Sequence, residues 1–173
     1  MVSKWLLAVV MVGVGSTQGA LRFDAPEGWL TVEPGSSMRY AEFVLPHVEG
    51  DGENASLVVY YFGGSGGSVE ANLERWLSQV EQPSGQSSQE VAKLGHFETD
   101  GGFPVTHLVV DGTYVAEVRP GSPVRHEKPG FTLEAAVVET PVGPYFVKVV
   151  GPAPTIDRWS SSIREFLQSI RYE

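Results

Sequence analysis

The segment 63–67, Gly-Gly-Ser-Gly-Gly, comes nearest to a catalytic motif in this chain. It matches the G-x-S-x-G pattern, in which a serine nucleophile stands on a sharp turn between a strand and a helix. Such a hydrolase also needs an acid and then a histidine downstream, and Asp100 or Asp111 followed by His126 has that order. One alternative function is therefore a small serine hydrolase with Ser65 as its nucleophile.

The surroundings of this segment favour a structural role for its glycines. The hydrolase motif belongs to a parallel sheet with repeated βαβ units, and this sequence lacks that pattern. Phosphate binding is disfavoured because no Gly-Lys-Ser/Thr ending follows and because Glu70 and Glu74 would repel an anion. Glycine's freedom to turn sharply explains the segment as a joint between a strand and a helix. We therefore predict no catalytic residue.

The helix predicted after this joint carries a polar row beside its apolar face, formed by Asn72, Arg75 and Gln79. The apolar residues, at spacings of three and four, are Val69, Leu73, Trp76, Leu77 and Val80. A second polar group lies in the proline-rich, basic loop 119–130 of an otherwise acidic chain. Arginine and tryptophan are frequent at binding hot spots, and basic loops suit acidic partners. The predicted binding surface comprises Asn72, Arg75, Gln79, Arg119, Arg125 and Lys128.

No set of residues has the spacing of a metal site. The four histidines are scattered over predicted loops and strands, whereas a zinc site needs three or four converging ligands. In the acidic loop 47–54, carboxylates alternate at Glu49, Asp51 and Glu53, but none follows at the far end of the loop, where calcium needs one. We predict neither a metal nor another cofactor.

The elements that must position these residues are strands in succession and two helices. Strands are predicted over 29–32, 38–45, 57–62, 91–97, 105–110, 131–138 and 145–150, with 113–118 as a continuation past a bulge or turn at Asp111 and Gly112. We expect one helix from the cap Ser68 to Pro83, a loop over 82–89, and a last helix capped by Thr155. Because successive strands pair antiparallel, the prediction is an α+β fold: a single antiparallel sheet of six to eight strands covered by two amphipathic helices.

Charge and composition exclude some classes of partner. The chain has 173 residues, with 12 lysines and arginines against 21 aspartates and glutamates. A surface with this excess of negative charge repels nucleic acid and anionic lipid. With no cysteine, the chain has neither a disulfide framework nor the cysteine of a lipoprotein anchor.

The first residues have the pattern of a secretory signal. One cation, Lys4, precedes an apolar run from Trp5 to Val14, and small residues follow. The run is too short for a membrane span, which needs about 20 apolar residues. We predict cleavage after Gly19, with Ala20 as the other option, and a single α+β domain over 20–173. Loss of Lys4 changes the formal net charge from −9 to −10. We expect a secreted protein of the bacterial periplasm that is not inserted in the membrane.

Several short motifs resemble the PsbP-like family. They are Phe23 with Pro26-Glu27-Gly28-Trp29, the Met38-Arg39 strand, the helix with Gly66-Gly67, Asn72 and Arg75-Trp76, and Gly151-Pro152 before the last helix. That family includes the lumenal extrinsic protein of photosystem II, and this chain looks closest to secreted bacterial members of unknown function. The resemblance implies an αβα sandwich in a non-catalytic protein that binds other proteins. No metal or photosystem contact of the family can be matched to this sequence residue by residue.

These observations lead to a secreted, non-catalytic binding or assembly module whose partner is another protein. The alternatives are the serine hydrolase above and a small-molecule carrier that holds its ligand between a helix and the sheet. The loops beside the first helix and the basic loop are the expected contact regions.

The signal assignment predicts a defined mature N-terminus. When the full chain is expressed in a Gram-negative host, the protein recovered from the periplasm should begin at Ala20, because a small residue at Thr17 suits the −3 position. Intact-mass spectrometry measures this directly. A periplasmic protein that keeps residues 1–19 would contradict the assignment.

Overall fold

The computed structural model describes residues 20–173, and the predicted signal peptide lies outside them. The fold is α+β, with an eight-stranded antiparallel sheet of order β2-β3-β4-β9-β8-β7-β5, in which β6 also pairs with β7. The strands are β2 (Leu30–Val32), β3 (Arg39–Leu45), β4 (Ala55–Tyr61), β5 (Val80–Glu81), β6 (Lys93–Glu98), β7 (Pro104–Tyr114), β8 (Lys128–Thr140) and β9 (Gly143–Pro152). The predicted fold class and number of strands in the main sheet are confirmed.

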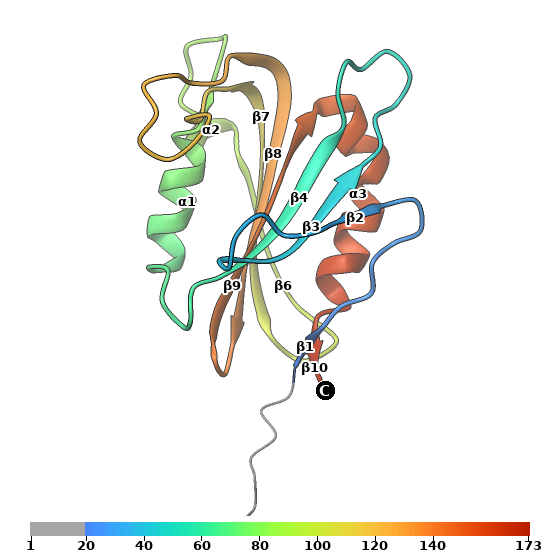
Figure 1. The fold of residues 1–173 in the computed structure, drawn as a ribbon. Coiled ribbons are helices and arrows are strands. Elements are labelled where there is room, and N and C mark those ends of the chain that lie inside the picture. Colours follow the sequence, from blue (N-terminus) through green and yellow to red (C-terminus); the bar gives the residue numbers. More distant parts are fainter. Residues whose placement is uncertain (1–19) are drawn as a thin grey trace, which may run out of the picture.

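A second, two-stranded sheet joins the two ends of the described chain. In it β1 (Leu21–Arg22) pairs antiparallel with β10 (Arg171–Tyr172). Figure 1 shows this pair beside the C-terminus, below the last helix. The sequence analysis did not predict this sheet, because each strand is too short to show a period of two.

The central strands are buried on both faces and are therefore covered twice. Every residue of β8 from Phe131 to Val138 is buried. Helix α3 (Ala153–Gln168) packs on one face and α1 (Val69–Leu77) on the other, as Figure 1 shows. Because side chains alternate along a strand, neighbouring residues of β8 and β9 enter different cores. The result is three layers, a sheet between two helices.

The two cores hold the apolar residues that the sequence analysis placed on helical faces. On the α1 side, Trp76 packs with Val80, Leu108, Val110, Leu133, Ala135, Val137 and Phe146. On the α3 side, Ile163, Phe166, Leu167 and Ile170 pack against strand residues such as Leu57, Val59, Val147 and Val149. Trp29 belongs to this second core and is buried.

The glycine segment forms the joint between β4 and α1. Gly66 has a φ of +125°, and a Cβ there would lie 2.5 Å from a ring carbon of Phe146. The backbone therefore needs glycine both for its conformation and for the close approach to the sheet. Ser68 caps α1 by accepting a hydrogen bond from the Ala71 N–H, as expected.

The boundaries of the first helix differ from the prediction. Helix α1 ends at Leu77, not at Pro83, and Val80 lies in β5, where it pairs with Tyr114 of β7. Val80 is nevertheless buried in the core under α1. Val80 would be buried in this core whether it continued the helix or lay in a strand. The spacing of apolar residues therefore could not show where the helix ends.

Two further local predictions were wrong. The segment predicted as a loop over 82–89 leads into a short helix, α2 (Ser88–Val91), which begins with a reciprocal capping box between Ser87 and Glu90. Helix α3 starts before Thr155, at Ala153, and no side chain caps it. Its first turn contains Pro154, whose missing N–H is tolerated there, while the Thr155 hydroxyl donates to Asp51 Oδ2 at 2.5 Å.

The alternatives at Asp111 and Gly112 are resolved in favour of a bulge. Strand β7 runs through both residues to Tyr114, and its register with β8 shifts after Gly112. The part expected to continue to residue 118 instead leaves the sheet after Tyr114. Across residues 20–173, no helix combines the length and apolar character needed to cross a membrane.

The close approach at Gly66 predicts unequal effects of two alanine substitutions. Gly66→Ala should lower the free energy of unfolding by ~3 kcal/mol, through backbone strain and overlap with Phe146. Gly63→Ala is the matched control: its φ is +64° but a Cβ there meets open space, so the loss should be ~1 kcal/mol. Chemical denaturation followed by tryptophan fluorescence measures both. Equal losses would mean that the contact with Phe146 does not constrain the joint.

Candidate functional site

The polar row of α1 does not act as one surface. Asn72 is buried, and its side-chain amide donates to the carbonyls of Gly66 and Ser68, each at 2.8 Å. Its Oδ1 accepts a hydrogen bond from the guanidinium of Arg75. Asn72 therefore fixes the glycine joint to the first turn of the helix, whereas Arg75 stays exposed.

Gln79, just after α1, reaches the sheet through a lysine. Its Oε1 accepts a hydrogen bond from Lys148 Nζ at 2.5 Å, and Lys148 also donates to the Tyr114 hydroxyl at 3.0 Å. The ammonium lies 5.2 Å from the centre of the Tyr114 ring, a cation–π contact. Lys148 lies on β9 between Phe146 and Val150, which face the α1 core. The sequence analysis did not single it out.

Burial shifts the titration of this lysine and of its tyrosine neighbour. Loss of solvation, together with the charge of Arg75, lowers the pKa of Lys148 to about 8. Burial raises the pKa of Tyr114 to about 12. Among the described residues no carboxylate forms an ion pair with Lys148, so two neutral oxygens and an aromatic ring hold its charge.

The connection between β7 and β8, residues 115–127, contains most of the predicted basic segment 119–130 and keeps the name basic loop below, although Glu117 and Glu127 balance its two arginines. At the base of the loop, Val115 forms hydrogen bonds with Gln79, just after α1, and with Arg125, near the other end of the loop. The Val115 N–H donates to the Gln79 carbonyl at 2.8 Å, and the Arg125 Nε donates to the Val115 carbonyl at 2.7 Å. The structure thus brings two of the predicted binding residues, Gln79 and Arg125, to the N–H and the carbonyl of one residue, Val115.

The tip of the basic loop is an ordered hairpin with exposed apolar side chains. The Val118 N–H donates to the Val124 carbonyl at 3.1 Å, and the Ser122 N–H donates to the Arg119 carbonyl at 3.0 Å. Val118 is 45% exposed and Val124 is 60% exposed. The prolines of this segment predicted a loop, but they gave no sign that Val118 and Val124 would pair, which only the structure shows.

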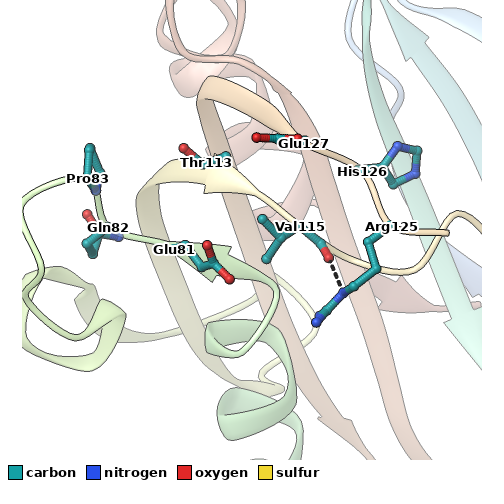
Figure 2. A pocket seen from close by; sticks show the side chains of 8 residues that line it. All are labelled: Glu81, Gln82, Pro83, Thr113, Val115, Arg125, His126 and Glu127. Carbon is teal, nitrogen blue, oxygen red and sulfur yellow. Dashed lines mark hydrogen bonds between the residues drawn. The ribbon is translucent and has the colours of Figure 1, made fainter. Parts of the chain in front are cut away.

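A cavity of about 390 Å³ separates the basic loop from the segment that follows α1. Figure 2 shows Arg125, His126 and Glu127 on the loop side, Glu81, Gln82 and Pro83 on the facing segment, and Thr113 and Val115 between them. His126 stacks on Tyr114, with ring centres 5.4 Å apart. Because the carboxylates of Glu81 and Glu127 and the guanidinium of Arg125 line it, the cavity offers both donors and acceptors to a polar group of a partner.

Arg125 alone of the six predicted binding residues lines this cavity, and the other two predicted from the 119–130 segment lie elsewhere. Arg119 is exposed at the tip of the basic loop. Lys128, at the start of β8, donates to Glu53 Oε2 at 2.5 Å, and its ammonium lies 5.3 Å from the centre of the Phe131 ring. Lys128 therefore ties β8 to the loop before β4, and its charge is already paired.

The residues of the hydrolase alternative have separate surroundings. The Ser65 N–H donates to the Phe62 carbonyl at 3.2 Å within the glycine joint. Asp111 accepts from the Thr132 hydroxyl, and His126 packs on Tyr114 in the basic loop. Within residues 20–173 no hydrogen bond connects the Ser65 side chain to a histidine, and no group of three or more His, Asp or Glu side chains is arranged to hold a metal ion.

No family model matches the sequence, and no curated protein matches it. Solved structures with a similar fold include the following two. One is a Pseudomonas aeruginosa protein of unknown function, PA94, at 13% identity and a TM-score of 0.47, covering 82% of this chain and 94% of that one. The other is cyanobacterial PsbP from Synechocystis, at 16% identity and a TM-score of 0.46, covering 93% and 96%. The resemblance noted in the sequence is to the family of this second protein, and both likenesses concern the fold alone.

The lowered pKa of Lys148 predicts a rise in stability with pH. An unfolded lysine titrates near 10.5 and the folded one near 8, so between these values the unfolded chain binds more protons. From pH 7.5 to 9.5 the free energy of unfolding should therefore rise by ~2 kcal/mol more in the parent than in Lys148→Met.

Denaturant titrations at several pH values measure this difference, with Lys93→Met, at an exposed lysine of β6, as the control. The control should follow the parent curve. Parallel curves for the parent and Lys148→Met would show that Lys148 is not held in a desolvated position.

Proposed function

We propose that this protein is a non-catalytic binding module that contacts another protein through the basic loop and the adjoining end of α1. The observation that carries the proposal is the ordered tip, where a backbone hydrogen bond holds Val118 and Val124 together in solvent. The exposed valines do not add to the stability of the fold through burial, because neither contributes to a core.

The loop has the features that reduce the cost of binding. Its base is fixed at Val115 by Gln79 and Arg125, and the Gly121 N–H donates to Glu117 Oε2 at 2.8 Å. A segment that is ordered before contact loses less conformational entropy on association than a flexible one. The apolar tip would then be the centre of the contact and the polar cavity beside it part of the rim.

The charges around the tip indicate the chemistry of the partner. Arg119 is exposed at the tip, and Arg125 lines the cavity together with Glu81 and Glu127. A partner surface with an apolar centre, a carboxylate opposite Arg119 and a cation opposite the two glutamates complements this region, and opposite charges accelerate encounter. We further propose that this contact takes place in the periplasm, after removal of residues 1–19, and not on nucleic acid.

The proposal predicts that binding depends on the tip of the loop. In the double variant Val118→Ser/Val124→Ser, the amount of partner captured from the native compartment should fall about tenfold, because the apolar centre of the contact is lost. Chemical crosslinking of the parent, followed by mass spectrometry, should place crosslinks within residues 115–128.

Val142→Ser is the matched control, since Val142 is 38% exposed in the β8–β9 turn and lies outside the basic loop. This variant should capture the partner as the parent does. The proposal fails if both variants behave alike, or if no protein is crosslinked to the loop in repeated experiments.

A further inference from the structure

The face of the sheet beneath α3 changes from apolar to polar along β7 and β8. From the core outwards, β8 presents Val138 and Ala136 to this face, followed by Glu134 and Thr132. On β7, Val105 is followed at alternate positions by His107, Val109 and Asp111. Polar residues at inward positions of central strands contradict the pattern of a packed core, and such exceptions concentrate at functional sites.

Glu134 is the most unusual of these residues. It is 5% exposed, in the middle of a strand that is otherwise apolar at neighbouring positions. Its Oε1 lies 2.7 Å from Nε2 of His107, which is 17% exposed. Beside this pair, the Thr132 hydroxyl donates to Asp111 Oδ1 at 2.5 Å. Burying a carboxylate is costly, so its retention at this position calls for a use.

Each of the two carboxylates keeps one oxygen free. Within residues 20–173 no hydrogen bond reaches Glu134 Oε2 or Asp111 Oδ2. Glu134 Oε2 is not fully enclosed, and Asp111 is an exposed residue. Both residues line a cavity of about 540 Å³ between β6–β8 and the first half of α3.

The lining of this cavity combines an acidic floor with apolar walls. Val109 comes from the sheet, and Ala153, Pro154 and Ile156 come from the start of α3, which also contributes Asp157. The lining also contains two cations, Lys93 and Arg164, both on exposed residues. Lys93 is exposed on β6, and the guanidinium of Arg164 lies 3.5 Å from the centre of the Phe97 ring. Apolar side chains beside convergent polar groups are typical of small-molecule sites.

We propose that this cavity binds a small organic amine. The ammonium would donate to the free oxygens of Glu134 and Asp111, which are charge-assisted hydrogen bonds, and the hydrocarbon part would pack against Val109 and Ile156. His107 positions the Glu134 carboxylate by occupying its other oxygen. The site lies on the α3 face, whereas the basic loop is fixed to the end of α1, so the two proposals are independent.

Butylamine and butyrate, which have similar apolar parts and opposite charges, test the proposal as probes. Calorimetric titration of the whole chain should show saturable binding of butylamine and none of butyrate. In heteronuclear NMR spectra the amide signals of His107, Val109 and Ile156 should shift with butylamine. Butyrate binding as tightly as butylamine, or butylamine failing to saturate the protein at millimolar concentrations, would overturn the proposal.

A pair of isosteric variants separates this site from general surface charge. Glu134→Gln keeps the size of the side chain and an oxygen for His107, and should weaken butylamine binding about tenfold. Glu139→Gln removes an exposed carboxylate of the same strand, outside the cavity, and should bind as the parent does. Equal losses in both variants would contradict a specific site.

A third variant keeps the two proposals apart. Val118→Ser/Val124→Ser should bind butylamine as the parent does, because the basic loop contributes no residue to this cavity. If Glu134→Gln changes the NMR spectrum throughout the chain, Asp111→Asn takes its place, since Asp111 is exposed and its loss leaves the core intact. Unchanged affinity in Asp111→Asn would then overturn the proposal.

Discussion

The double-sided burial of the central strands is the constraint on which the rest of the structure depends. Strand β8 is buried from Phe131 to Val138, and β9 alternates between the two cores. A strand of this kind is stable only if apolar surface covers both of its faces. The chain supplies that cover with α1 before the central strands and α3 after them. Everything else in the fold, including the glycine joint, serves to bring these helices onto the sheet.

The joint shows how tightly this constraint acts. Phe146 of β9 fills the space next to Gly66, so the chain must turn there without a side chain. Asn72 then secures the turn from within the helix by its two hydrogen bonds to backbone carbonyls. In this segment, which resembles a nucleophile elbow in sequence, one aromatic contact explains the glycine at position 66 and one buried amide holds the turn.

Polar groups gather at the places where the helices leave the sheet incompletely covered. On the α1 face, Lys148 lies against Gln79 and Tyr114 beside the base of the basic loop. On the α3 face, Glu134 and His107 form the floor of a cavity. Both sets include an ionisable side chain that is at least partly buried, Lys148 or Glu134, which a purely structural core does not require. They are therefore the places where we propose that this molecule meets a partner and a ligand.

The sequence by itself determined the fold class, the long strands of the main sheet and the apolar faces of both long helices, because these follow from local periodicity, but it placed the short strand β5 in the first helix. It also indicated Gln79 and Arg125 as binding candidates, but not that they meet at Val115. Only the tertiary structure decided that Asn72 is buried, that Lys128 is paired with Glu53, and that Glu134 contacts His107 on the neighbouring strand. The physical reason is that hydrogen bonds and cavities join residues far apart in the chain, where the spacing of residue types carries no information about distance.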